Sequence, residues 1–159
     1  MRTLLTLFLA CAPAWGQTNL LTSPNDIRDA SWGKTLITTP TASTWVDDGT
    51  GGHILQHVYG LAASTTYTIS FTISCSTATT LYEQVWDSAF STRLLSPGGE
   101  RAISITGSPL LVTQTFNSGT NTDVWLMFYD GAASITYTIT GATLYQETSA
   151  SKRKVIVVN

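Results

Sequence analysis

The 159-residue sequence contains few charged residues, few histidines and few cysteines. Asp, Glu, Lys and Arg together make up 11% of the residues, against about 25% in ordinary globular domains. The net charge of −2 argues against a protein that binds nucleic acid through many phosphate contacts. Two cysteines and two histidines are too few for a disulfide framework or a multi-ligand zinc site. Hydrophobic residues nevertheless make up 43%, which distinguishes the chain from a disordered polar tract.

The N-terminus carries an apolar segment that is too short to cross a membrane. Arg2 precedes an apolar stretch at residues 4–10, and small residues with a proline continue to residue 16. This is the pattern of a secretory signal peptide, whereas a membrane-spanning helix needs about 20 apolar residues. We predict no membrane span and interpret residues 1–16 as a signal peptide, with a retained anchoring arm as the alternative. Its removal would leave Cys75, interpreted as a small buried apolar residue, as the single thiol.

Apolar and polar residues alternate along much of the remaining chain. Tyr67, Ile69, Phe71 and Ile73 alternate with Thr and Ser, which predicts a half-buried antiparallel strand. The 28 Thr and 16 Ser residues fit the outward positions of such strands, because β-branched side chains suit a pleated surface. Strands are predicted at residues 35–39, 43–47, 53–59, 66–74, 80–87, 101–106, 111–117, 123–130 and 134–140. With no sustained helical periodicity, the predicted fold class is all-β: an antiparallel β-sandwich of the jelly-roll type.

The strand at 80–87 carries the main candidate binding residues. Tyr82, Gln84 and Trp86 share one face, whereas Leu81, Glu83 and Val85 share the other. If the first set faces outward, the rings offer apolar area to the C–H groups of a sugar and the amide offers hydrogen bonds to its hydroxyls. In the alternative interpretation, Tyr82 and Trp86 face the core and Glu83 faces solvent. The sequence leaves both orientations open.

Two other aromatic residues are candidate ligand-binding residues. Trp45 lies beside an acidic, glycine-rich loop, which predicts a site at the loop edge. Tyr129 lies in a segment, residues 124–129, that is apolar at every position. Such a segment predicts a central strand that is either covered on both faces or uses its second face for binding. Asp47 and Asp48 offer the oxygen ligands that a structural Ca²⁺ prefers, with a simple turn as the alternative, and no other cofactor is predicted.

No arrangement of side chains typical of an enzyme is found. On a strand, His53 and His57 lie about 13 Å apart, too far to share a metal ion through bonds of about 2.1 Å. The same distance separates Glu83 from Asp87, whereas the carboxylates of glycosidases lie about 5–10 Å apart. The sequence contains neither a Gly-x-Ser-x-Gly nucleophile motif nor a phosphate-binding loop. We therefore predict a protein that is not an enzyme.

The C-terminal residues differ in charge from the rest of the chain. Residues 17–150 are predicted to form the domain and residues 151–159 a tail. Four Lys or Arg and ten Asp or Glu give residues 17–151 a net charge of −6, whereas the tail carries +3. The tail ends in four β-branched apolar residues, interpreted as a strand of the protein's own sheet or, alternatively, as an assembly strand that docks on a partner chain: Val155, Ile156, Val157 and Val158.

Several segments resemble a known family in their order and spacing. These are residues 19–21, 29–34, 56–61, 66–71 and 139–147, and the resemblance extends over residues 19–148. They resemble the carbohydrate-binding-module-like (galactose-binding-like) jelly rolls of bacteriophage tail and virion proteins and of secreted polysaccharide-degrading enzymes. The resemblance implies a jelly-roll fold and leaves the ligand unspecified, because fold does not fix function.

The resemblance implies a non-catalytic module that binds a surface polysaccharide or glycan. It favours a phage virion component (a tail fibre, spike or decoration) that assists attachment to the host surface. Such a protein would lie on the virion surface or outside the cell, as a homo-oligomer or beside virion neighbours. The alternatives are a structural or assembly virion protein without glycan binding, and a secreted bacterial surface protein.

Overall fold

Two five-stranded antiparallel sheets form a sandwich in the computed structural model, which describes residues 17–38, 41–48, 51–95, 98–130 and 134–147. Sheet A contains, in spatial order, β1 (Trp32–Thr35), β4 (His53–Tyr59), β9 (Asp123–Tyr129), β6 (Thr79–Asp87) and β7 (Glu100–Ile105). Sheet B contains β2 (Ile37–Thr38), β3 (Thr44–Asp47), β10 (Thr136–Gln146), β5 (Thr66–Cys75) and β8 (Leu110–Asn117). The predicted fold class, an antiparallel β-sandwich, is confirmed.

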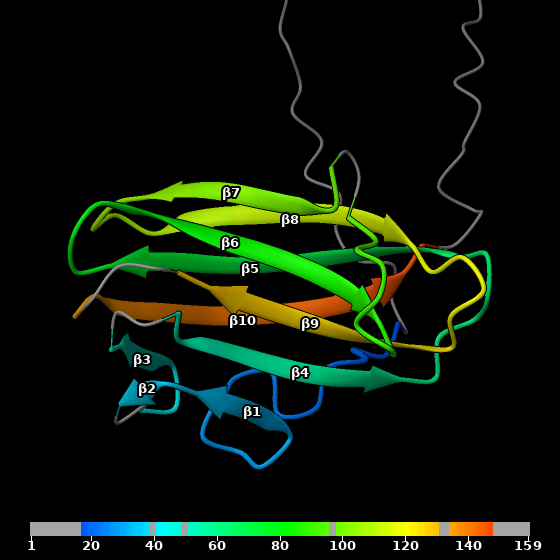
Figure 1. The fold of residues 1–159 in the computed structure, drawn as a ribbon, viewed down its shortest axis with the longest axis horizontal. Coiled ribbons are helices and arrows are strands. Elements are labelled where there is room, and N and C mark those ends of the chain that lie inside the picture. Colours follow the sequence, from blue (N-terminus) through cyan, green and yellow to red (C-terminus); the bar gives the residue numbers. More distant parts are fainter. Residues whose placement is uncertain (1–16, 39–40, 49–50, 96–97, 131–133, 148–159) are drawn as a thin grey trace, which may run out of the picture.

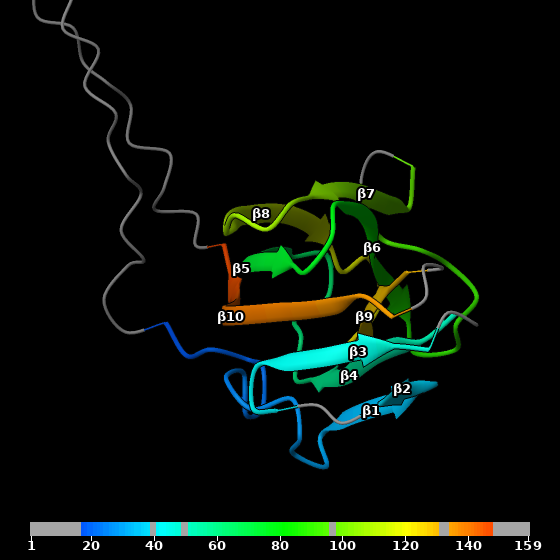
Figure 2. The same cartoon turned by 90° about the vertical axis from the view of Figure 1, so that its left-hand side faces the viewer.

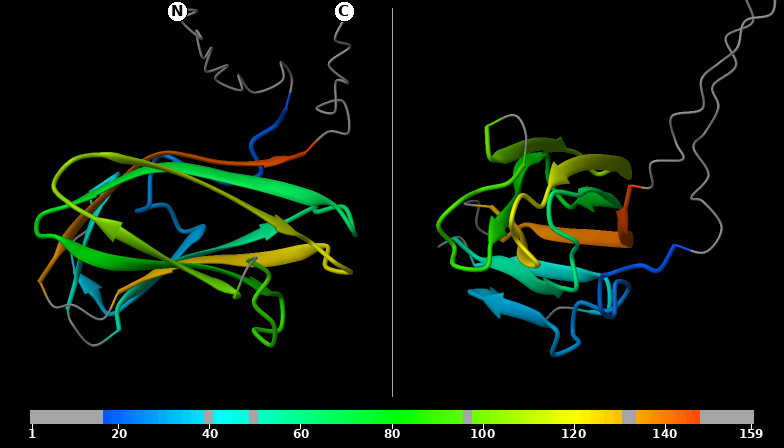
Figure 3. Two further views of the ribbon diagram at one scale, coloured as in Figure 1. Left: turned by 90° about the horizontal axis from the view of Figure 1, so that it is seen from above. Right: turned by 90° about the vertical axis from the view of Figure 1, so that its right-hand side faces the viewer.

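The two sheets lie face to face and are seen in the left view of Figure 3. In Figure 1, β7 and β8 lie at one edge of the sandwich, and the short strands β1, β2 and β3 lie at the other. The first described residues run beside the end of β10 (Figure 2), where the amide of Leu20 donates to the carbonyl of Leu144 over 3.0 Å. The described chain therefore begins and ends on the same side of the sandwich.

The observed strands differ from the predicted ones at two places. The strand expected at residues 35–39 is split, because the chain leaves sheet A after Thr35 and enters sheet B at Ile37. Leu36 makes this turn with a φ of +53°. The strand expected at residues 134–140 continues to Gln146, and its pairing with β5 shifts between Thr140 and Thr143. Gly141 has a φ of +62° within this bulge, a conformation that glycine adopts readily.

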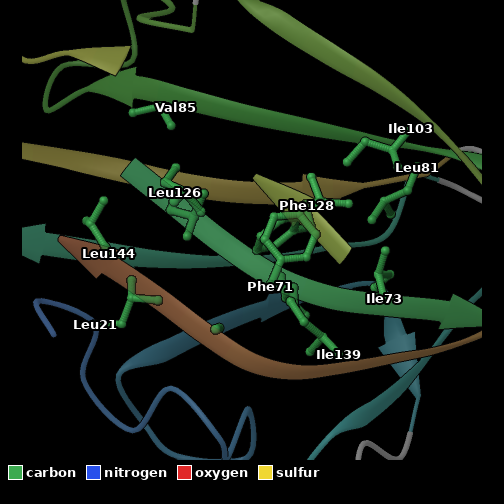
Figure 4. Packing of buried hydrophobic residues seen from close by; sticks show 14 of the residues in the cluster. Leu21, Phe71, Ile73, Leu81, Val85, Ile103, Leu126, Phe128, Ile139 and Leu144 are labelled. Carbon is green, nitrogen blue, oxygen red and sulfur yellow. The ribbon is translucent and has the colours of Figure 1, made fainter. Parts of the chain in front are cut away.

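Alternate residues of both sheets form one apolar core between them. Some of its members are shown in Figure 4, among them Phe71 and Ile73 from β5, and Leu126 and Phe128 from β9. The Phe71 and Phe128 rings meet edge to face, with centroids 4.9 Å apart and planes at 78°. This contact joins the central strand of sheet A to sheet B and fixes the inward phase of β9. The alternate residues of β9, which include Met127 and Tyr129, therefore point outward.

Glu83 is an acidic side chain inside this apolar core. It points inward from β6 between Leu81 and Val85 and is fully buried. Neither carboxylate oxygen has a hydrogen-bond partner among the described residues. Burial raises the pKa of Glu83 from 4.5 to about 7, although the positive charge of Arg101 acts in the opposite direction. At a given pH, the carboxyl group of Glu83 is therefore more often protonated than that of an ordinary glutamate.

Within these described ranges, no helix is long and apolar enough to span a membrane. The proposed segments 1–16 and 151–159 lie outside the described residues, as do the assembly residues Val155, Ile156, Val157 and Val158. The roles predicted for them stay predictions.

Candidate functional site

The outer face of sheet A carries most of the aromatic side chains that are not in the core. On β6, Leu81, Glu83 and Val85 point inward, so Tyr82, Gln84 and Trp86 point outward. Of the two orientations that the sequence left open, the outward one is the orientation in the structure. Residues of β4 and β9 with the same phase lie on this face too: His53, Leu55, His57, Tyr59, Asp123, Trp125, Met127 and Tyr129.

The strand register arranges these side chains in three rows that cross the sheet. The tyrosine row contains His53, Tyr129, Tyr82 and Ala102. The middle row contains Gly33, Leu55, Met127, Gln84 and Glu100. The tryptophan row contains His57, Trp125 and Trp86. Because neighbouring rows are two residues apart along each strand, they are separated by about 7 Å.

The two aromatic rows therefore flank an apolar strip. Tyr82 and Tyr129 stack with ring centroids 5.0 Å apart. Between the tyrosine and tryptophan rows, the half-buried side chains of Leu55 and Met127 form the floor. An apolar strip between ring-bearing rows offers a surface for the C–H groups of a sugar chain.

Rings and a guanidinium group pack against one another along the tryptophan row. Trp125 stacks on His57 on one side, with centroids 4.0 Å apart, and on Phe90 on the other, 5.2 Å apart. Phe90 also lies 6.0 Å from Trp86. The guanidinium carbon of Arg93 lies 4.7 Å from the centre of the Trp86 ring. Packing on both sides holds Trp125 in one orientation.

A turn anchored by Asp87 carries Phe90 to this row. The carboxylate of Asp87 accepts hydrogen bonds from the amide and the hydroxyl of Ser91. These hydrogen bonds lower the pKa of Asp87 below its ordinary value, so its carboxylate stays ionised. Phe90 has a φ of +54°, which is costly for a bulky residue. The turn thus holds Phe90 in an unfavourable backbone conformation over Trp125.

One carboxylate oxygen, Oε2 of Glu100, connects the middle row to both aromatic rows. It accepts hydrogen bonds from Gln84 Nε2 at 2.6 Å, from Arg93 Nη1 at 3.0 Å and from Tyr129 Oη at 3.1 Å. Gln84 Oε1 in turn accepts from the indole N–H of Trp86 at 2.6 Å. Burial and the bond to Glu100 raise the pKa of the Tyr129 hydroxyl, so it remains a neutral donor. Charge-assisted bonds of this kind fix side-chain orientation.

Gln84 has a different role from the one predicted. Its side chain is 1% exposed, and its carbonyl and its amide nitrogen are bonded to Trp86 and Glu100. The amide therefore positions the ring of Trp86 instead of presenting hydrogen-bonding groups to solvent. The sequence showed that Gln84 lies between two aromatic residues, but it did not show that Glu100 would be its partner.

The prediction for Trp45 is wrong. Trp45 is 1% exposed and stacks on Tyr137, with centroids 5.0 Å apart. Its side chain points into the apolar core between the sheets, so the ring is covered although the acidic loop begins two residues later. A buried ring cannot present its face to a ligand.

The acidic pair at the end of β3 is tied into the surrounding backbone. Asp47 is 1% exposed, and its Oδ1 accepts a hydrogen bond of 3.3 Å from the amide of Gly52. The amide of Asp48 donates to the carbonyl of Leu36. The described ranges contain no cluster of three or more His, Cys, Asp or Glu that could hold a metal ion. A Ca²⁺ ion at Asp47 and Asp48 stays a prediction.

His57 is bound within the protein instead of pairing with His53. Its Nε2 lies 2.7 Å from Oδ2 of Asp123 on the adjacent strand, and its ring lies between those of Tyr59 and Trp125. Stacking and this hydrogen bond together hold the end of the tryptophan row. His57 is thus a structural member of the aromatic face.

A separate shallow cleft of about 310 Å³ lies away from these rows. It is lined by Gln17, Thr18, Leu20, Gly60 and Gln146, and these residues include no aromatic or charged side chain. The aromatic face carries both kinds of side chain, which are the groups that recognise ligands. We therefore take the outer face of sheet A as the candidate site.

Comparison with known proteins identifies the fold. No protein-family model and no curated protein sequence matches the chain. Among solved structures, the N-terminal cellulose-binding domain of Cellulomonas fimi β-1,4-glucanase C is similar, with a TM-score of 0.63 and 17% identity over 83% of this chain and 99% of that domain. A CBM4 module is similar with a TM-score of 0.62 and 19% identity over 74% of this chain and 95% of that module. The fold is that of a carbohydrate-binding-module jelly roll.

The same jelly roll occurs in a bacteriophage protein. The enzymatically active domain of tailspike protein 4 from bacteriophage CBA120 is similar, with a TM-score of 0.57 and 11% identity. The similarity covers 81% of this chain and 21% of the tailspike chain. At these identities the likeness shows that the fold is shared, and the ligand has to be argued from the site.

Proposed function

We propose that this jelly roll is a non-catalytic module that binds a polysaccharide on the outer face of sheet A. The observation that carries the proposal is the pair of aromatic rows on either side of the Leu55 and Met127 floor. The similar structures support it, since they include a cellulose-binding domain and a xylan-binding domain. In this arrangement the sugar chain lies across the strands, along the middle row.

The charge of the domain favours a neutral glycan. Residues 17–151 carry a net charge of −6, and the carboxylates of Glu100 and Asp123 contact Tyr129 and His57 of the two aromatic rows. A chain that contains uronic acids or sulfate groups is negatively charged, and the negative charge of the domain would repel it. The proposed ligand is therefore an uncharged polysaccharide that binds through C–H contacts and hydroxyl hydrogen bonds.

The proposal predicts that truncation of an outward ring weakens binding. Tyr82→Ala and Trp86→Ala are each expected to raise the Kd about tenfold, a loss of about 1.4 kcal/mol, because each removes apolar contact with the sugar. Affinity electrophoresis against hydroxyethylcellulose, arabinoxylan and β-1,4-galactan measures the change. Tyr145→Ala is the matched control, since Tyr145 is a half-buried aromatic residue on sheet B. A loss with Tyr145→Ala that equals the loss with the other two would contradict the proposed face.

The finer part of the proposal is that the module belongs to a phage virion and assists attachment to the host surface. The similarity to a phage tailspike domain supports this setting. Several copies on one particle would add weak single sites into strong attachment.

A virion component assembled in the cytoplasm keeps its N-terminus, so this setting requires that residues 1–16 are the retained arm and not the signal peptide of the first interpretation. In this setting the intact mass of the native protein includes residues 1–16. A mass lower by these residues would show signal-peptide cleavage. That result would favour a secreted bacterial protein over the virion.

A further inference from the structure

Arg93 covers one of the aromatic rings of the tryptophan row, that of Trp86. Its guanidinium carbon lies 4.7 Å from the centre of the Trp86 ring, and a backbone bridge pairs the two residues. The guanidinium is planar and weakly hydrated, so it packs well on an aromatic face. It therefore occupies the position over Trp86 that a sugar ring would take.

The outer face of sheet A holds Arg93 through Glu100. Arg93 Nη1 lies 3.0 Å from Oε2 of Glu100, with the two side chains 39% and 29% exposed. Glu100 is fixed in turn by Gln84 and Tyr129. An ion pair this exposed is weak and screened by salt, so the contact restrains Arg93 without preventing its release.

The other cations of the described ranges are occupied elsewhere. Arg28 pairs with Asp26, and Lys34 donates to backbone carbonyl groups, including that of Trp32. Arg101 reaches from β7 to the carbonyl of Thr113 and the side chain of Gln114 on β8. In this part of the chain, Arg93 is thus the Lys or Arg side chain that packs on the aromatic rows.

We propose that Arg93 is an autoinhibitory cap on Trp86, which a glycan must displace before a sugar ring can stack there. This inference rests on the proposed polysaccharide-binding function. The cap lowers affinity for every neutral glycan by the free energy of its contacts with Trp86 and Glu100.

The direct test is the substitution Arg93→Ala. Because the cation–π contact and the exposed ion pair are both lost, the Kd for a neutral polysaccharide is expected to fall about fivefold. Arg93→Lys is the matched control: it keeps the charge beside Glu100 but lacks a planar group for stacking, so it should give an intermediate Kd. The measurement is affinity electrophoresis with hydroxyethylcellulose, arabinoxylan and β-1,4-galactan.

The outcomes separate this inference from the proposed function. Weaker or unchanged binding by Arg93→Ala, with binding by the wild-type protein, would overturn the cap and leave the polysaccharide-binding function in place. If neither protein binds any of the three polysaccharides, the proposed function fails, and the cap with it. Tighter binding by Arg93→Ala supports both.

The salt dependence of the binding affinity gives a second test, which uses the wild-type protein alone. A neutral polysaccharide has no charges to screen, but salt weakens the pair between Arg93 and Glu100. Isothermal titration calorimetry of the wild-type protein should therefore show about twofold tighter binding when NaCl is raised from 0.05 to 0.5 M. Weaker or unchanged binding at the higher salt concentration would show that the pair with Glu100 does not hold Arg93 against a ligand and would overturn the cap.

Discussion

Glu83→Gln is expected to raise the free energy of unfolding by about 3 kcal/mol at pH 9 and to change it little at pH 4. The wild-type carboxyl group is fully buried and has no hydrogen-bond partner among the described residues. Burial raises its pKa from 4.5 to about 7. Above pH 7 the folded protein must hold an ionised carboxylate in its core, whereas glutamine has nearly the same shape and no charge.

The direction of the pH dependence follows from proton binding. Between pH 4.5 and 7, the folded state holds the Glu83 proton more tightly than the unfolded state does. The stability that this group contributes is therefore fully present below pH 4.5 and is lost as the pH rises through about 7. The Glu83→Gln variant has no carboxyl group to ionise at this position, so it does not lose this stability as the pH rises.

Urea unfolding of both proteins from pH 4 to pH 9 measures the effect. The difference between their unfolding free energies isolates Glu83 from the other titrating groups. Equal pH slopes for the two proteins would show that Arg101 compensates the buried charge fully and would contradict the account.

Phe128→Ala is expected to lower the free energy of unfolding by about 4 kcal/mol, because it removes a large buried ring and leaves a cavity between the sheets. The side chain is fully buried and meets Phe71 edge to face. It also lies on β9, between the outward residues Met127 and Tyr129. Thermal or urea unfolding measures the loss.

Phe90→Ala is the matched control for this substitution. Phe90 is 44% exposed, so its removal should cost less than about 1 kcal/mol. A double-mutant cycle between Phe71 and Phe128 should give a coupling of about 1 kcal/mol for the edge-to-face pair. A loss with Phe128→Ala as small as the loss with Phe90→Ala would be incompatible with the packing in Figure 4.

The strands were predictable from the sequence where only one face of a strand is apolar. Tyr67, Ile69, Phe71 and Ile73 alternate with Thr and Ser, and all four are buried in the structure. On β6 both faces carry large side chains, so alternation alone could not decide which face is inside. The usual preference of charged residues for solvent is no guide to the orientation there, because Glu83 is buried near the charge of Arg101.

Part of the candidate site depends on contacts between distant segments. Tyr82, Trp86 and Tyr129 were found from their phase on two strands, and Trp125 shares the phase of Tyr129. Phe90 and Arg93 lie in the connection between β6 and β7, and nothing in their local sequence indicates that they pack on this face. Trp45 shows the converse, because its position near a loop did not reveal that its side chain points into the core.

The most direct test of the account is to map the ligand on the protein by NMR. Amide and indole signals are recorded while an oligosaccharide of the best-bound polysaccharide is added. The account predicts that the largest shifts fall on the outward residues of β4, β9 and β6 and on the indole N–H of Trp86, with little change at Tyr145 on sheet B. Shifts confined to sheet B or to the cleft lined by Gln17 and Gln146 would contradict it.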